Sequence, residues 1–206
     1  MRYTVTTDQK TFFEQRGFIE FDGLVTEQQL AVLQRCAAGL DNSRRDPEIK
    51  KIVYSLLFAS IAVDLAKQAK LRFGYDLLYE LPLQRSIPMS LQQMSCIRPL
   101  ACALMICLEG ENEGEGEGAE KSRINESFVP FPHKPGNAVF FSPQAMWDMP
   151  TLQKCSPQKC LLIAYASPRS MYVYNEDDEY THALKRLGLG FGDRLTEEHH
   201  PLLFRR

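Results

Sequence analysis

The chain of 206 residues is 44% hydrophobic and 24% charged, and its formal net charge is -2. These values are typical of one globular domain that buries its own core, and the near-neutral charge argues against a nucleic-acid-binding surface, which carries an excess of Lys and Arg. No apolar run reaches the roughly 18 to 20 residues that a membrane-spanning helix needs, and the polar N-terminus lacks the apolar segment of a secretory signal. We therefore expect a cytoplasmic protein whose partners include neither a membrane nor nucleic acid.

The six cysteines include no Cys-x-x-Cys motif and no compact disulfide framework. We interpret them as reduced, small core residues. If residues 100–108 form a strand, Cys102 and Cys107 point to opposite faces because they are an odd number of residues apart, so they cannot share one metal ion. Cys155 and Cys160 lie closer to a hairpin geometry, and a link between these two stays open.

The first elements are predicted from local helix and strand patterns. Residues 8–16 have a helical pattern, and residues 18–21 alternate like a short strand. Thr26 and Gln29 form a capping box, worth about 1 kcal/mol, at the start of a second helix. The apolar face of this helix predicts that it ends near Gly39.

The next segment is predicted to be a long helix followed by strands. Asp46 and Pro47 are typical of a helix start, and the helical pattern continues to about Arg72. Its wide apolar face predicts burial against a sheet. The sequence then changes to strands and turns, with strands expected over residues 77–81, 90–97 and 101–108.

The segment from Glu109 to Glu120 contains six glutamates and four glycines. It cannot bury enough apolar surface to order itself, so we expect a mobile acidic loop between two strands. A calcium site is disfavoured there because the Asp and Asn spacing of a calcium-binding loop is missing.

The C-terminal part is predicted to hold one helix and a polar tail. Residues 176–187 begin with acidic and end with basic residues, which complements a helix dipole. The Gly-x-Gly-x-Gly pattern of residues 188–192 follows this helix instead of a strand, so it is not a dinucleotide-binding motif. His199 and His200 lie in the predicted flexible tail, where they would bind metal only adventitiously.

The most strand-like segment, residues 131–174, is predicted to form a long β-hairpin. Residues 138–141 and 161–165 are its strands, because both are apolar runs that contain β-branched and aromatic residues. The connecting loop carries Trp147, the only Trp of the chain, followed by Asp148. This loop is where the sequence predicts a functional site.

This order of elements resembles the last part of the jelly-roll core in the phytanoyl-CoA dioxygenase-like branch of the non-haem Fe(II)/2-oxoglutarate oxygenases. A Pro-Gly-Asn turn at residues 135–137 leads into a strand that ends in aromatic residues, and a loop and a second strand follow. An aromatic-rich helix and then Gly-Phe-Ile-Glu-Phe also resemble the start of these proteins. The resemblance covers residues 10–40 and 98–167.

The resemblance implies an α+β fold, with a double-stranded β-helix (jelly-roll or cupin-like) core and N-terminal helices packed on one sheet. It implies a single domain over residues 1–206. Within it we expect a helix-rich flank at about residues 1–75, the jelly-roll core at about 76–175 with the acidic loop 109–120, and a C-terminal helix and tail over 176–206.

The resemblance also implies where an iron site would lie. The last iron-binding His of the family corresponds to Trp147, and the basic residue that binds 2-oxoglutarate corresponds to Lys159. The first two ligands come as His-x-Asp or His-x-Glu, because alternate residues of a strand point the same way, yet none of the four histidines is followed by an acidic residue two positions later. The corresponding segment, residues 88–94, offers only weak ligands for Fe(II), namely Ser90, Gln92 and Gln93.

Our leading interpretation is a non-catalytic binding module for a small molecule or a protein. It has no metal site, no catalytic residue and no expected cofactor, and its candidate pocket consists of Trp147, Asp148, Lys159 and Gln92. In the plain structural interpretation, Trp147 fills the core and Lys159 is a solvated residue at a strand end.

Two other functions stay open at this point. An active oxygenase would bind Fe(II) and 2-oxoglutarate through an atypical ligand set drawn from Asp148, His133 or a cysteine. A metal-responsive or DNA-binding regulator would need a recognition helix and a basic face, and the sequence indicates neither.

Overall fold

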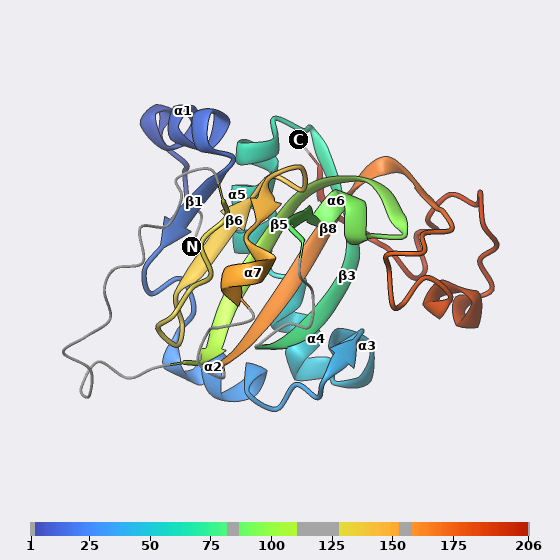
Figure 1. Cartoon of the computed structure of the whole chain (residues 1–206), viewed down its shortest axis with the longest axis horizontal. Helices are drawn as coiled ribbons and strands as arrows, with labels where there is room; N and C mark the ends of the chain where they lie inside the picture. The colour runs from blue at the N-terminus through green and yellow to red at the C-terminus, as the bar shows by residue number, and fades with distance from the viewer. Residues whose placement is uncertain (1–2, 82–86, 111–127, 153–157, 206) are drawn as a thin grey trace.

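The computed structural model describes residues 3–81, 87–110, 128–152 and 158–205. These residues form a mixed fold of helices and antiparallel sheet (Figure 1), which confirms the predicted α+β class. The predicted acidic loop lies outside the described residues from position 111 onward. Within the described parts, no helix is long and apolar enough to cross a membrane.

Most of the helices precede the long strands in the chain. The helices are α1 (Thr7–Arg16), α2 (Glu27–Leu33), α3 (Asn42–Arg45), α4 (Pro47–Val53), α5 (Leu56–Ala66), α6 (Leu91–Met94), α7 (Met149–Leu152) and the 3-10 helix η1 (Ala183–Leu187). The strands are β1 (Phe18–Phe21), β2 (Gly39–Leu40), β3 (Lys70–Leu81), β4 (Met89–Ser90), β5 (Ile97–Glu109), β6 (Ala138–Phe141), β7 (Met146–Trp147), β8 (Gln158–Tyr172) and β9 (Leu202–Arg205).

The strands form two antiparallel sheets. The large sheet has the order β1-β6-β5-β8-β3-β2, and β9 also pairs with β3. The small sheet consists of β4 and β7. At the centre of the large sheet lie β5 and β8, with 13 and 15 residues.

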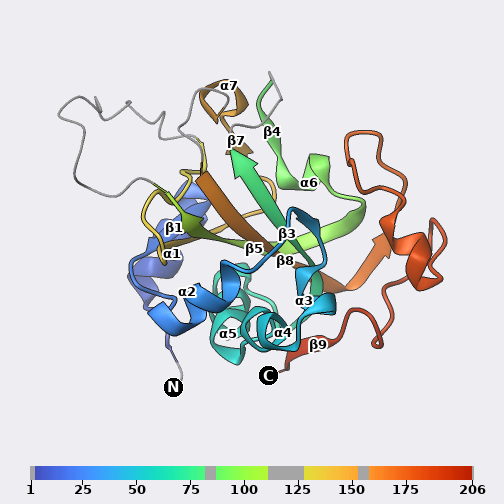
Figure 2. The same cartoon turned by 90° about the horizontal axis from the view of Figure 1, so that it is seen from below.

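The large sheet buries both of its faces (Figure 2). Helices α2, α4 and α5 lie on one side of it, and the small sheet lies with α6 and α7 on the other. We call the apolar cluster on the helix side the helix-side core; it includes Phe58, Phe73, Leu161, Ile163 and Tyr165. We call the cluster on the other side the inner core; it includes Leu91, Phe141, Trp147, Cys160 and Leu162.

Alternation between these two cores explains the apolar runs of the sequence. Successive residues of a strand point to opposite faces, so a strand buried on both faces is apolar at every position. In β8, Leu161 packs in the helix-side core and Leu162 in the inner core. In β5, Cys102 and Cys107 are likewise in different cores, which confirms that they face opposite sides.

The predicted hairpin over residues 131–174 is wrong. β6 pairs with β1 and β5, whereas β8 pairs with β5 and β3. In β5, Ala103 is aligned with Phe141 on one side and with Ala164 on the other, so β5 separates the two expected partners. An apolar pattern identifies a strand, but it does not determine which strand pairs with it. Here β5 is apolar on both faces and pairs with both β6 and β8.

The predicted starts of α2 and α4 are confirmed, but the predicted end of α2 is wrong. Thr26 Oγ1 accepts a hydrogen bond from the backbone N–H of Gln29 at 3.2 Å, and Gln29 Oε1 accepts one from the Thr26 N–H at 3.1 Å. Asp46 caps the start of α4. However, α2 ends at Leu33 instead of near Gly39, because Gly39 pairs with β3 as part of β2.

The long helix predicted up to Arg72 is in fact two helices followed by a strand. Ser55 separates α4 from α5, since its Oγ accepts a hydrogen bond from the Leu57 N–H at 3.2 Å and caps a new helix. Lys67 ends α5 in a left-handed conformation, with φ of 52°. β3 then begins at Lys70, and the strand expected over residues 90–97 contains α6.

The C-terminal segment is not a flexible tail. β9 pairs with the first residues of β3, and His200 just before it is fully buried. His200 Nδ1 donates a hydrogen bond to the Gly74 carbonyl at 2.8 Å, whereas Nε2 has no partner among the described residues. The helix predicted over residues 176–187 is reduced to turns and η1.

His200 is held to the sheet as a neutral imidazole. Burial lowers its pKa from 6.5 to about 4, and the positive charge of Arg44 adds to this effect. Arg44 Nη1 donates to the His199 carbonyl at 2.7 Å, and Arg72 Nη1 donates to the His200 carbonyl at 2.6 Å. The two guanidinium groups therefore fix the backbone of the segment that the imidazole anchors.

We predict that the protein loses stability as the pH falls from 6.5 toward about 4. In this interval His200 of the unfolded chain binds a proton, whereas buried His200 does not, so protons favour the unfolded state. The expected loss in the free energy of unfolding is on the order of 3 kcal/mol. Urea unfolding across this pH range measures it.

His200→Asn removes the titrating group and leaves an amide that can still donate to Gly74, so this part of the pH dependence should disappear. His199→Asn is the matched control, because His199 is the half-exposed neighbour and should leave the dependence intact. If His200→Asn unfolds with the same pH dependence as the natural chain, His200 is not the group responsible.

Candidate functional site

The small sheet joins the two segments in which we expected the iron-ligand positions of the family that this sequence resembles. Met89 is aligned with Trp147, and Ser90 is aligned with Met146. Immediately afterwards β4 leads into α6, and α7 follows β7 closely. The structure therefore brings residues 88–94 and Trp147 together at one place.

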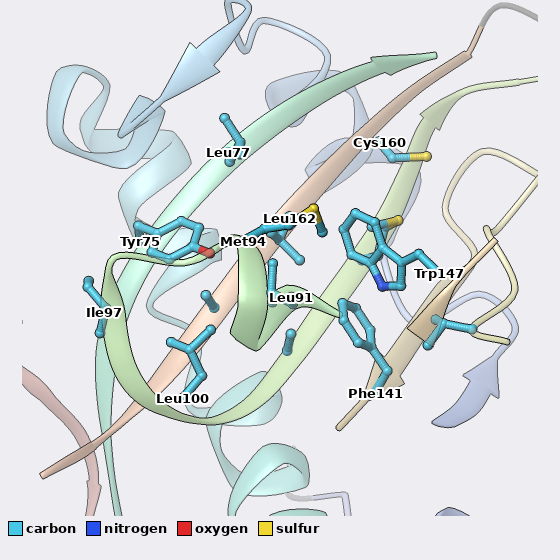
Figure 3. Packing of buried hydrophobic residues seen from close by; sticks show 14 of the residues in the cluster. Tyr75, Leu77, Leu91, Met94, Ile97, Leu100, Phe141, Trp147, Cys160 and Leu162 are labelled. Carbon is cyan, nitrogen blue, oxygen red and sulfur yellow. The ribbon is translucent and has the colours of Figure 1, made fainter. Parts of the chain in front are cut away.

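Trp147 occupies this place with an apolar ring. Its side chain is 0% exposed, and the ring centroids of Phe131, Tyr79 and Phe141 lie 5.2, 5.5 and 5.7 Å from it in edge-to-face arrangements. Figure 3 shows the Trp147 ring beside Phe141 and Cys160. Its Nε1 has no hydrogen-bond partner in the part of the chain that the structure describes, so the ring is held by packing.

The polar side chains of residues 88–94 hold the local backbone. Ser90 and Gln93 form the capping box of α6, in which Gln93 Oε1 accepts a hydrogen bond from the Ser90 N–H at 2.8 Å. Gln92 Oε1 accepts one from the Leu100 N–H at 2.9 Å. The other side chains that meet Trp147 here are apolar and buried, namely Met89, Leu91 and Met94.

Of the two remaining residues of the predicted pocket, Asp148 directly follows Trp147, whereas Lys159 lies on the opposite face of the large sheet. Lys159 Nζ forms an ion pair with Glu109 at 3.0 Å. Its side chain leaves β8 on the face opposite to that of Cys160, which points into the inner core. Asp148 is partly buried, and its carbonyl accepts a hydrogen bond from the Leu152 N–H at 3.0 Å in the turn of α7. Lys159 is thus separated from Trp147 by the strand itself.

A pocket of about 240 Å³ lies next to the Trp147 cluster and was not predicted. Tyr79 lines this pocket and also contacts Trp147. Three parts of the chain form the walls: β2 with β3, the junction of α6 and β5, and the turns around residues 177–184. Aromatic, aliphatic and acidic side chains line it, among them Tyr75, Leu77, Tyr79, Glu80, Met94, Asp177, Asp178, Glu179, Tyr180 and Leu184. Figure 3 shows that Tyr75, Leu77 and Met94 belong to the inner core on its β3 side.

Asp178 fixes the C-terminal wall of the pocket to the α6–β5 junction. Its Oδ2 accepts a hydrogen bond from the Cys96 N–H at 2.6 Å, and its Oδ1 accepts one from the Tyr180 N–H at 2.8 Å. Burial raises the pKa of Tyr180, and the charges of Glu179 and Asp178 raise it further. No sequence signal indicates this wall, because residues 176–180 have the pattern of an acidic helix start.

Comparison with known proteins identifies the fold but no family. No family model and no curated protein matches the sequence. Among solved structures, the non-heme alpha ketoglutarate dependent carbocyclase SnoK from nogalamycin biosynthesis has a TM-score of 0.68 and 18% identity, with 98% of this chain and 99% of that chain covered. The epimerase SnoN from the same biosynthesis has a TM-score of 0.66 and 15% identity, with 95% and 97% covered. EctD from S. alaskensis has a TM-score of 0.56 and 12% identity, with 80% and 77% covered.

These likenesses confirm a jelly-roll fold of the kind found in iron- and 2-oxoglutarate-dependent enzymes. They also correct one expectation. The sequence-based expectation of no cofactor is wrong, because structures with this fold contain Fe3+ and alpha ketoglutarate in SnoN, bound Fe in EctD, and 2-oxoglutarate in EctD. Iron and 2-oxoglutarate are therefore the cofactors to which the fold points.

The described residues at the corresponding place do not fit such an iron centre. It requires two imidazoles and one carboxylate on one face of the metal, whereas the side chains gathered there are those of Met89, Leu91 and Trp147. Over residues 3–81, 87–110, 128–152 and 158–205, no group of three or more His, Cys, Asp or Glu side chains is arranged to hold a metal ion.

We predict that Trp147→Ala lowers the free energy of unfolding by about 3 to 5 kcal/mol, because it empties a large, enclosed space in the inner core. Urea unfolding followed by circular dichroism measures this loss. Trp147→Phe keeps one aromatic ring and leaves a smaller cavity than Ala does, so it should cost less than half as much.

Phe191→Ala is the matched control for a change outside the core, since Phe191 is 40% exposed and should cost much less. A Trp147→Ala variant as stable as the natural chain would show that Trp147 is not a packing residue and would favour its role as the wall of a ligand site.

Proposed function

We propose that this chain binds a small molecule and has the oxygenase fold without catalysing a 2-oxoglutarate-dependent oxidation. The observation that carries the proposal is the fully buried Trp147 at the junction of β4 and β7. In the resembling family, this position and the segment corresponding to residues 88–94 supply the iron ligands. Here the same junction is occupied by an indole ring and by aliphatic and thioether side chains.

The use of the polar side chains at this junction supports the proposal. Ser90, Gln92 and Gln93 accept hydrogen bonds from backbone N–H groups of α6 and β5. A side chain engaged in this way is fixed in direction by the backbone, and neutral hydroxyl and amide oxygens are weak ligands for Fe(II). These residues therefore stabilise the shell of the fold.

The pocket beside Trp147 supports a binding function. It is concave, and its lining combines an apolar floor with a few polar groups, which is the usual composition of small-molecule sites. Its volume of about 240 Å³ is below the roughly 300 to 1,000 Å³ of pockets for drug-sized ligands. The proposed ligand is therefore small.

An active oxygenase with an atypical ligand set is the second function. The likeness to SnoK and SnoN over nearly the whole chain favours it, and it would use the iron and 2-oxoglutarate to which the fold points. Asp148 follows Trp147 directly, whereas His133 is exposed and lines a different pocket. The phytanoyl-CoA dioxygenase-like branch stays a prediction under either function.

We predict that the purified protein forms no succinate when it is supplied with Fe(II), 2-oxoglutarate, ascorbate and oxygen. The reason is that the described residues at the β4–β7 junction include no imidazole, and Asp148 does not belong to a described group of three or more His, Cys, Asp or Glu side chains arranged to hold iron. Mass spectrometry of succinate, compared with heat-denatured protein, is the measurement. The protein is prepared without a histidine tag, because the imidazoles of a tag bind iron themselves.

Succinate above the denatured control overturns the proposal and establishes the second function. Asp148→Asn and His133→Asn then show which side chain acts as a ligand, because the variant that lacks the ligand stops forming succinate. Glu198→Gln removes an exposed carboxylate at another place and serves as the control.

A further inference from the structure

The charge of the pocket beside Trp147 is one-sided. Its C-terminal wall has three acidic residues, Asp177, Asp178 and Glu179, and no described lining residue is Lys, Arg or His. The whole chain has 24 basic and 26 acidic residues, so the imbalance belongs to this pocket and not to the protein in general. An anionic ligand would meet only like charges at its walls.

Asp178 is held at the pocket wall by two backbone hydrogen bonds. The backbone N–H groups of Cys96 and Tyr180 hold its two oxygens, and neither donor carries a full positive charge that would neutralise the carboxylate. The field of Asp178 reaches both sides of the pocket. Burial raises the pKa of Tyr75 and of Tyr180, and the charge of Asp178 contributes to the rise in each case.

Aromatic rings form the opposing walls. Tyr75 and Tyr79 lie on the same face of β3, because they are separated by an even number of residues. Tyr180 comes from the C-terminal turn and reaches across to β2, since its hydroxyl is 3.4 Å from the point where a Cβ on Gly39 would lie. Tyrosine faces attract ammonium groups through the negative charge of the ring face.

The geometry points to a small organic cation as the ligand of this pocket. We propose a molecule with an ammonium group that lies near Asp178 and the tyrosine rings, and a short apolar body that lies on the floor. This inference rests on the proposed binding function and names the class of ligand. The floor consists of apolar side chains, namely Leu77, Met94, Ile97, Met149 and Leu184.

A bare divalent metal ion is the alternative ligand for the acidic residues that line the pocket, which we call its acidic rim. Two features disfavour it. Both oxygens of Asp178 already accept backbone hydrogen bonds, and the described acidic side chains do not form a group arranged to hold a metal. Metal ions such as Mg2+ also require oxygen ligands on all sides, whereas the floor of this pocket is apolar. An organic cation uses both the rim and the floor.

The test compares probes that differ in charge but little in shape. Choline is the cation, dimethylbutanol is its neutral carbon analogue, 2-oxoglutarate is the anion, and Mg2+ is the bare metal ion. Calorimetry measures the binding of each to the full chain. The fluorescence of Trp147 gives a second readout, because its ring is 5.5 Å from that of Tyr79, which lines the pocket. Choline should bind at least tenfold more tightly than dimethylbutanol.

Asp178→Asn removes the charge and keeps one acceptor oxygen, so it also gives up one of the two backbone hydrogen bonds. It should weaken choline binding by about fivefold or more. Glu179→Gln changes an exposed lining residue of the same wall, so it tests the same charge effect without removing a hydrogen bond of Asp178. Asp193→Asn is the matched control, since Asp193 Oδ2 also accepts a backbone hydrogen bond, from Gly190 at 2.7 Å, but lies outside the pocket lining. It should leave choline binding unchanged.

Equal binding of choline and dimethylbutanol, or preferred binding of 2-oxoglutarate, overturns the cationic ligand while the proposed binding function stands. Binding of Mg2+ that excludes choline assigns the rim to a metal and also overturns the inference. Choline binding unaffected by Asp178→Asn and Glu179→Gln places the cation elsewhere and overturns it as well. Failure of the proposed function is recognised separately, by succinate formation.

Discussion

The antiparallel pairing of β5 with β8 is the constraint on which the other features of the structure depend. Leu104 is aligned with Ile163 and Met105 with Leu162, and the two aligned pairs lie in different cores. A shift of one residue would exchange the faces of the whole strand. Since β3 and β6 pair with the outer edges of these strands, the same register decides that Tyr75 and Phe141 face the small sheet. The position of the Trp147 cluster and of the pocket follows from it.

Features that depend on neighbours in the sequence could be predicted, whereas features that depend on distant partners could not. The capping box of Thr26 involves residues three apart, and it lies where the pattern predicts it. The end of α2 is decided by β3, which takes Gly39 as a pairing partner. The partner of β6 is likewise decided by β5, which is apolar on both faces. The burial of His200 depends on the free edge of β3 and has no signature in the polar sequence around it.

The candidate site likewise combines features that could be predicted from the sequence with features that depend on distant partners. The resemblance to the oxygenases implied that Trp147 and residues 88–94 lie at one position, and the pairing of β4 with β7 brings the two segments together. The expected neighbourhood of Lys159 depended on which face of β8 it leaves, and that choice is made by the register of the central strands. The pocket could not be predicted, because its walls come from separate parts of the chain and Asp178 lies in a segment with the pattern of an acidic helix start.

The packing of the inner core and the acidic pocket are linked through the α6–β5 junction. Asn175 Nδ2 donates to the carbonyls of Gln93 and Ser95 at 2.7 and 3.1 Å, and Asp178 accepts from the Cys96 N–H. The C-terminal wall is therefore held by the backbone just after α6, whose Leu91 is part of the inner core with Trp147. Filling the jelly roll with apolar side chains makes this junction rigid, since an enclosed core resists displacement. A rigid junction in turn keeps Asp178 at one position opposite the tyrosines of β3. The packed apolar interior thus stabilises the fold. Through this junction it also holds the acidic pocket in place.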